Sequence, residues 1–303
     1  MMKGLTRFLK TLLVLVAFGA SAVTSTFFIV AQTDELADDR LRMSSVQAPE
    51  PKPTAPRFAR WVSTVVGSGF QDFGQSHTGP VKNVLADRLP VTASVGFLSW
   101  AFGWGIGLVL AILLATRWRD WASFHQKRVY PIVHAIPSLV VVIVFYLILV
   151  QFDPSPSRLI RTIVGIVSLT VLLIPGATAL WLNGILRILD REYVRVARSR
   201  GISPVQLWAK HIMPNVLVSS GVLTQAVFSL SALVVGSAFV EGVFRLGGVG
   251  EAFIEGATRG QAELAGFATF LYFLVTAAGV LLAEAVVIYL DPDGEIGREL
   301  QAA

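Results

Sequence analysis

Long apolar runs separated by shorter polar intervals recur along the whole chain. A run of about 20 residues is long enough to cross a bilayer as a helix. Such runs occupy residues 7–31, 91–116, 129–152, 160–186, 216–240 and 264–290. The pattern predicts an all-α membrane protein with six transmembrane helices, the fourth kinked at Pro175 and Gly176.

The polar intervals divide the chain into four predicted parts. Residues 1–31 form an N-terminal transmembrane helix, and residues 32–90 form an external loop. Residues 91–290 form a core of five transmembrane helices, and residues 291–303 form a cytoplasmic tail. Prolines at positions 49, 51, 53 and 56 predict an extended linker inside the external loop. The mildly amphipathic segment 61–73 is predicted to lie at the membrane surface.

The first apolar run has two interpretations. The small residues at 19–22 could form the cleavage site of a signal peptide. The run continues for about nine residues beyond them, which favours a retained transmembrane helix. Lys3, Arg7 and Lys10 at its start place the N-terminus in the cytoplasm, and six crossings then place the C-terminus there too.

Residues 187–215 form a long polar interval in the apolar second half. Arg191, Arg195 and Arg198 recur at helical spacing, with Glu192 placed to pair with Arg195. Gly201 follows as a predicted helix end. The interval is therefore predicted to begin with a short basic helix. A basic loop also fits the general excess of positive charge on the cytoplasmic side, which requires no function.

The second half of this interval predicts another helix. Ser203 suits an N-cap, Pro204 suits the first helical position, and Gln206 completes a capping box. Pro214 is predicted to end or kink this helix. The two short helices would then meet at a fixed corner outside the bilayer.

The residue order in this interval resembles the signature loop of ABC importer permeases. The matching residues are Glu192-Tyr193-Val194, Ala197-Arg198, Gly201 and His211-x-Met213-Pro214-Asn215. The likeness is strongest to the first-permease type of the binding-protein-dependent peptide/nickel (dipeptide/oligopeptide) branch. It implies a type I ABC importer permease fold, in which this loop is a cytoplasmic coupling helix docked into an ATPase. The residues that it assigns to ATPase coupling are Glu192, Tyr193, Ala197, Arg198, Gly201, Ser203, His211 and Pro214.

Two further segments resemble the same family. Residues 73–94 resemble its G-x-S, G-x-P-V and R-L-P-x-T pattern, and the matching residues are Gly74, Ser76, Gly79, Pro80, Val81, Arg88, Leu89, Pro90 and Thr92. Residues 241–250 resemble its V-E-x-V-F-x-x-P-G-L-G loop. Gly247 stands where that loop usually has proline, and Asp293 replaces the arginine of a D-P-R ending. The family's Pro-Gly-Asp-Pro motif after the first span is replaced by the sequence AQTDELADD. Glu241 is interpreted as structural.

The resemblance also implies partners and a location. It implies a second homologous permease subunit, two cytoplasmic ATPase subunits that bind ATP and Mg, and an extracytoplasmic substrate-binding protein. The complex would lie in the lipid bilayer of a bacterial cytoplasmic (inner) membrane. Short peptides are the expected substrate, and nickel chelates, opines, glutathione and sugars remain open.

Composition and charge exclude several other classes. The chain is 54% hydrophobic and 15% charged, whereas soluble domains have about 25% charged residues. The net charge of +5 arises in loops, and no nucleic-acid module is present. The chain contains no cysteine, no phosphate-binding G-x-x-x-x-G-K-[ST] loop and no metal-ligand spacing among its four histidines. We therefore expect a non-enzymatic subunit that binds no cofactor itself.

Polar residues inside the predicted spans are candidates for the translocation path, because burying them in lipid is costly. Gln225 lies in the fifth run and Glu284 in the sixth. The simpler interpretation is that both form hydrogen bonds between helices. A proton relay through Glu284 would instead indicate an ion-coupled secondary transporter or channel with no ATPase partner. A membrane-anchored scaffold would explain the basic loop but not its glycine and proline spacing.

Overall fold

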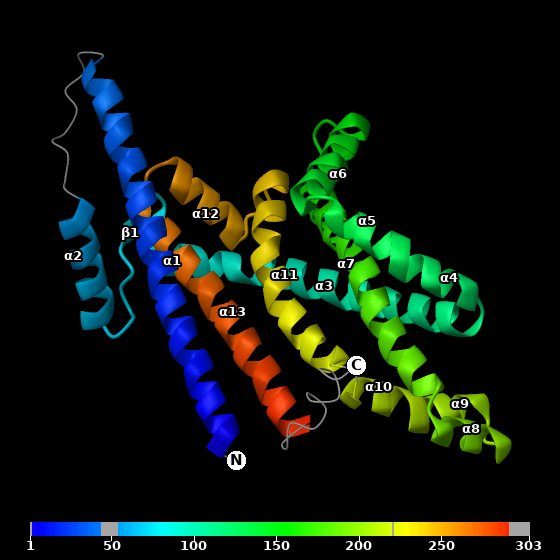
Figure 1. The fold of residues 1–303 in the computed structure, drawn as a ribbon. Helices are drawn as coiled ribbons and strands as arrows, with labels where there is room; N and C mark the ends of the chain where they lie inside the picture. The colour runs from blue at the N-terminus through cyan, green and yellow to red at the C-terminus, as the bar shows by residue number, and fades with distance from the viewer. Residues whose placement is uncertain (1, 44–53, 220, 291–303) are drawn as a thin grey trace.

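The computed structural model describes residues 2–43, 54–219 and 221–290, which are almost entirely helical (Figure 1). The first helices are α1 (Met2–Met43) and α2 (Thr54–Gly67), and the antiparallel strands β1 (Gln75–Ser76) and β2 (Gly79–Pro80) follow them. The next elements are α3 (Val81–Thr116), α4 (Arg119–Phe124), the π-helix η1 (His125–Val129), α5 (Tyr130–Ala135), α6 (Ser138–Phe152) and α7 (Arg158–Leu189). The chain continues with α8 (Glu192–Ser199), α9 (Pro204–Leu207), the π-helix η2 (Trp208–Ile212), α10 (Met213–Ser219), α11 (Val222–Phe244), α12 (Val249–Thr258) and α13 (Ala262–Leu290).

Within the described residues, five helices are long and apolar enough to span a membrane. They cover Phe8–Gln32, Val81–Thr116, Arg158–Leu189, Val222–Phe244 and Ala262–Tyr289. The predicted third span, 129–152, is not one straight helix. The segments Arg119–Val133 and Ser138–Phe152 meet at an angle of 81°, and together they could supply a sixth crossing.

Proline explains this break. Ile136 has φ −79° and ψ 122°, the extended conformation that a following proline favours, since its ring disfavours a helical residue before it. Pro137 then occupies the N-cap position before α6, where its missing N–H removes no helical hydrogen bond. The apolar run at 129–152 therefore contains two helical segments, because proline restricts the residue before it.

Other helix boundaries also differ from the predictions. Helix α3 begins at Val81 rather than at residue 91 and passes through Pro90. The predicted external loop contains α2, which includes the fourth proline of the predicted linker. The prolines at 49, 51 and 53, and the tail 291–303, lie outside the described residues. Helix α7 continues through Pro175.

Small residues allow the long helices to approach closely. A methyl group added to Gly107 would lie 2.8 Å from the Ala177 side chain of α7. One added to Gly96 would lie 2.8 Å from Val234 of α11. Gly105 has no atom within 4 Å of such a methyl group, so it takes no part in this packing.

The helices arrange the polar segments at two ends of the molecule (Figure 1). The segment α8–α10 lies toward the same end as the start of α1 and the end of α13. We call this the loop end. Helix α12 lies toward the opposite end, where the chain turns from α11 into α13.

Candidate functional site

Helix α8 is held at the loop end by its apolar side. Val194 is fully buried and Ala197 is 6% exposed, whereas Arg195 and Arg198 are exposed. The buried pair belongs to a hydrophobic cluster that also contains Ile185 of α7. This amphipathic division fixes α8 against the transmembrane core and leaves its basic side available for contact.

The corner between α8 and α9 has the predicted geometry. Gly201 has φ +74°, a conformation that L-residues with side chains rarely adopt, and its N–H donates to the Arg198 carbonyl oxygen at 3.0 Å. Two residues later, the Ser203 hydroxyl accepts a hydrogen bond from the Gln206 N–H at 3.4 Å. Helix α9 therefore starts at a defined N-cap.

Pro214 does not end the second helix. The helix continues through η2 and α10 to Ser219, with the π-helical turn immediately before Met213. Proline lacks an N–H and its ring crowds the carbonyl four residues earlier. The wider turn of a π-helix accommodates this disruption without breaking the helix.

The predicted ion pair between Glu192 and Arg195 is wrong. Both Glu192 and Arg195 are described and exposed, but they form no salt bridge. Arg195 instead donates to the Asp190 carbonyl oxygen at 3.4 Å. Glu192 is therefore an exposed acid beside several exposed arginines. Burial raises the pKa of the neighbouring Tyr193 hydroxyl, and Arg191 partly opposes this shift.

His211 lies partly buried within η2, and its carbonyl oxygen accepts a hydrogen bond from the Asn215 side chain at 2.7 Å. Val205 of α9 is 79% exposed and Val196 of α8 is 47% exposed. Apolar side chains beside exposed arginines are typical of protein contact surfaces. The α8–α9 corner therefore presents a mixed apolar and basic surface.

A buried polar cluster holds three helices together at the opposite end. Glu241 of α11 is fully buried. One of its oxygens, Oε2, accepts from the Thr92 hydroxyl at 3.0 Å and the Gly250 N–H at 2.7 Å. The other, Oε1, accepts from the Ser237 hydroxyl at 2.7 Å. The Thr92 hydroxyl oxygen in turn accepts a hydrogen bond from the Val249 N–H at 2.9 Å. This cluster joins α3, α11 and the start of α12, which supports a structural role for Glu241.

The loop between α11 and α12 is fixed by further contacts. Gly247 has φ +79° and donates its N–H to Glu251 at 2.6 Å. Two nitrogens of Arg158, the first residue of α7, donate to the Leu246 carbonyl oxygen at 3.1 and 2.7 Å. Proline could supply neither this φ nor this N–H, so glycine is required in the observed loop conformation.

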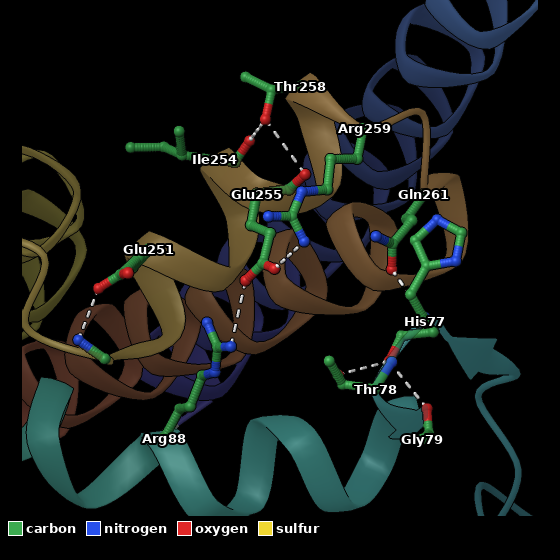
Figure 2. Close-up of polar contacts among 12 residues, drawn as sticks. His77, Thr78, Gly79, Arg88, Glu251, Ile254, Glu255, Thr258, Arg259 and Gln261 are labelled. Carbon is green, nitrogen blue, oxygen red and sulfur yellow. Dashed lines mark hydrogen bonds and ion pairs between the residues drawn. The ribbon is translucent and has the colours of Figure 1, made fainter.

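Figure 2 shows how α12 is tied to its neighbours. Arg88 of α3 forms an ion pair with one carboxylate oxygen of Glu255 at 3.1 Å, and Arg259 forms an ion pair with the other oxygen at 2.6 Å. The His77 N–H of the β-hairpin donates to the Gln261 side chain at 3.2 Å. These contacts join segments that are far apart in the sequence into one polar assembly around α12.

The two candidate path residues do not come together. Gln225 lines a cavity of about 220 Å³ with Trp104, Tyr130 and Ser229. Its side chain makes no hydrogen bond to another described residue. Glu284 of α13 is only 8% exposed and does not line this cavity.

The sequence interpretation missed two residues beside Gln225. The Trp104 indole N–H donates to the Ser229 hydroxyl at 2.8 Å, linking α3 to α11. Leu172 and Leu173 of α7 line this cavity and also a second one of about 270 Å³. The available signal was Trp104 itself, since a tryptophan inside an apolar span usually finds a partner for its N–H.

Comparison with known families identifies the chain. The family model described as "binding-protein-dependent transport system inner membrane component" matches residues 107–294, which is more than half of the sequence. The chain belongs to this family. The match includes α7, the loop-end segment, α11 and α12, and it gives no support to the ion-coupled alternative.

Curated permeases resemble the chain over about three quarters of its length. A protein of Brucella suis assigned to a peptide transport system as a permease is 28% identical over 247 residues, covering 76% of this chain and 77% of its own. A dipeptide transport system permease of Bacillus subtilis is 24% identical, covering 73% and 74% respectively.

Solved ABC transporters share the fold. A chain from an amino acid ABC transporter crystallised with histidines has a TM-score of 0.52 and 18% identity, covering 74% of this chain and 96% of its own. A chain from a methionine ABC transporter in inward-facing conformations has a TM-score of 0.51 and 24% identity, covering 70% and 99%.

These findings confirm the predicted fold class, a helical type I importer permease, and the predicted role. The chain is an inner-membrane permease subunit of a binding-protein-dependent ABC importer. As a family member it is a transport subunit. Among the described residues, no group of three or more His, Asp or Glu side chains could hold a metal ion.

Proposed function

We propose that this permease couples ATP hydrolysis by partner subunits to uptake of short peptides, with the α8–α9 corner docked on an ATPase. The complex would contain a second homologous permease, two ATPase subunits holding ATP and Mg, and an extracytoplasmic binding protein. The loop end and both termini would face the cytoplasm. Glu192, Tyr193, Arg198 and the exposed valines would contact the ATPase.

The observation that carries this proposal is the shared hydrophobic cluster beneath the corner. Val194 and Leu207 pack in the same cluster as Ile185 of α7 and Val222 of α11. A close-packed core transmits displacement instead of absorbing it. A pull on the exposed face of α8 and α9 would therefore move two membrane-spanning helices together. Gly201, Ser203 and Pro214 would keep the angle of the corner fixed.

A pull-down from mild detergent tests this assembly. Wild type should recover two ATPase subunits and a second permease. Val205→Arg places a charge at an exposed position of the proposed contact and should weaken ATPase recovery while keeping the second permease. Thr78→Arg, at an exposed position of the β-hairpin at the opposite end, is the matched control. Equal ATPase recovery from both variants would contradict docking through this corner.

The path itself is proposed to run past Gln225. Two cavities share Leu172 and Leu173 along α7 and α11, and an amide without a protein partner could bond a peptide group. Peptides are proposed because the named relatives act in peptide and dipeptide transport. Gln225→Leu should lower uptake of labelled dipeptides into proteoliposomes while leaving complex assembly intact. Unchanged uptake would remove Gln225 from the path.

A further inference from the structure

Another cavity lies between α1, α2 and α13, apart from the two cavities along α7 and α11. It has a volume of about 530 Å³, which is within the range of roughly 300–1,000 Å³ typical of ligand sites. Ala20 and Val23 line it from α1, Val62 and Val66 from α2, and Phe270 from α13. We call this cavity the flank groove. Figure 1 places these three helices on the side away from α4–α7, so the groove is separate from the proposed path.

The flank groove lies at the depth of the bilayer interior. Its α1 residues run from Val16 to Thr24, which are eight residues from each end of the span Phe8–Gln32. At 1.5 Å per helical residue, this is about 12 Å from either end. Its α13 residues likewise belong to a membrane span. The occupant must therefore come from the hydrocarbon region.

The described lining of the groove is almost entirely apolar. Its lining includes no charged side chain among the described residues. The Thr24 hydroxyl donates to the Ala20 carbonyl oxygen at 2.7 Å, and the Trp61 indole N–H donates to the Phe73 carbonyl oxygen at 2.9 Å. Both donors are already used. Water needs two or more polar partners to occupy a cavity, so this lining fits an apolar molecule and not water.

Specific contacts fix the positions of the three helices that line the groove. Arg57 at the start of α2 forms a bidentate ion pair with Glu263 of α13, at 3.0 and 2.8 Å. Its guanidinium also lies 5.9 Å from the ring centre of Phe27. Gly19 lets α1 meet the Phe273 ring directly, since any side chain there would overlap it. The ion pair fixes the start of α2 to α13, and Gly19 packs α1 against α13. These contacts define the groove between the three helices.

Apolar side chains also surround the opening. Val66 is 61% exposed, Phe70 is 53% exposed and Val62 is 37% exposed. We propose that the flank groove binds an acyl chain of a membrane phospholipid, which fills the space between α1, α2 and α13. Because the described residues that line the groove carry no charge, the acyl chain is recognised and the head group is not.

Native mass spectrometry of the purified complex tests this site. The detergent-solubilised complex would be supplemented with phosphatidylethanolamine or phosphatidylglycerol, and retained lipid would be counted. Ala20→Phe and Val23→Phe fill the groove from α1. Leu13→Phe is the matched control, because Leu13 is 71% exposed on the same helix and does not line the groove.

We expect wild type and the Leu13 variant to retain one more phospholipid than either filling variant, with roughly tenfold or greater loss of that lipid on filling. Both head groups should be retained equally. Equal retention by all four proteins, no retained lipid, or strong preference for one head group would each overturn the proposal. The sequence has no native cysteine, so Val66→Cys adds a single crosslinking point. A crosslink from it to a partner subunit would show that protein covers the groove and would also overturn the proposal.

Discussion

The buried cluster around Glu241 gives the sharpest stability prediction. Replacing Glu241 with alanine removes the acceptor of three donors, from Thr92, Ser237 and Gly250. The Ser237 hydroxyl keeps an alternative, because the Val234 carbonyl oxygen lies 2.7 Å away. The Gly250 N–H is fixed by the helix start and has no such alternative. The change therefore leaves two donors poorly satisfied.

The expected loss follows from these two donors. An unsatisfied buried donor costs about 1–3 kcal/mol, so Glu241→Ala should destabilise the protein by about 2–6 kcal/mol. On the scale for domains of 150–250 residues, each kcal/mol shifts the melting temperature by roughly 2–4 °C. The apparent melting temperature should then fall by at least about 4 °C.

Glu241→Gln provides the matched comparison. A glutamine can keep its oxygen toward Thr92 and Gly250 and turn its NH₂ toward the Ser237 oxygen, which can accept. Melting would be followed by tryptophan fluorescence on the purified complex. The glutamine variant should melt closer to wild type than the alanine variant does. An alanine variant that melts like wild type would refute the reasoning, as would a glutamine variant equally destabilised.

Three further substitutions test other parts of the structure. Gly201→Val forces a β-branched residue into φ +74°, at a cost of more than about 1–2 kcal/mol. It should reduce substrate uptake while ATP hydrolysis continues, and Gly201→Asn should have a milder effect. Normal uptake by the valine variant would contradict a fixed corner. Gly247→Pro loses both the φ of +79° and the N–H that donates to Glu251. Recovery of intact complex on size-exclusion chromatography should therefore fall. Full recovery would show that the loop can adopt another conformation. Gly107→Leu overfills a tight helix contact, at about 1–3 kcal/mol, and should lower the melting temperature, whereas Gly105→Leu meets open space; equal effects would rule out close packing as the cause.

The sequence predicted features that depend on local chemistry. Five membrane-spanning helices followed from apolar length, and the Gly201 corner followed from its C-terminal glycine and the Ser203 cap. The break at Pro137 has a sequence signal in the restriction that proline places on the residue before it, but the apolar run at 129–152 continues on both sides of it. The continuation through Pro214 depends on a π-helical turn, which has no comparable sequence signal.

Contacts between distant segments could not be predicted from one sequence. Arg57 and Glu263 are 206 positions apart, and Thr92 and Glu241 are 149 apart. Each pair forms only because packed helices bring the two residues together. Glu192 and Arg195 show the converse, since helical spacing permits their ion pair but the structure does not form it. An exposed pair of this type contributes only about 0.3–0.5 kcal/mol, too little to fix its geometry.

Helix α11 links the two ends of the permease. At the loop end, its residues Val222 and Ala226 share a buried cluster with Val194 of α8. At the opposite end, Glu241 ties it to α3 and α12. Gly221, with φ +68°, separates it from α10 and permits a change of angle there, as hinges at element ends do. Under the proposed function, a pull on α8 would therefore move the loop end of α11 about a fixed opposite end. The cavity beside Gln225 lies one helical turn from this hinge. Its walls would therefore move, while the Glu241 cluster at the opposite end stays in place.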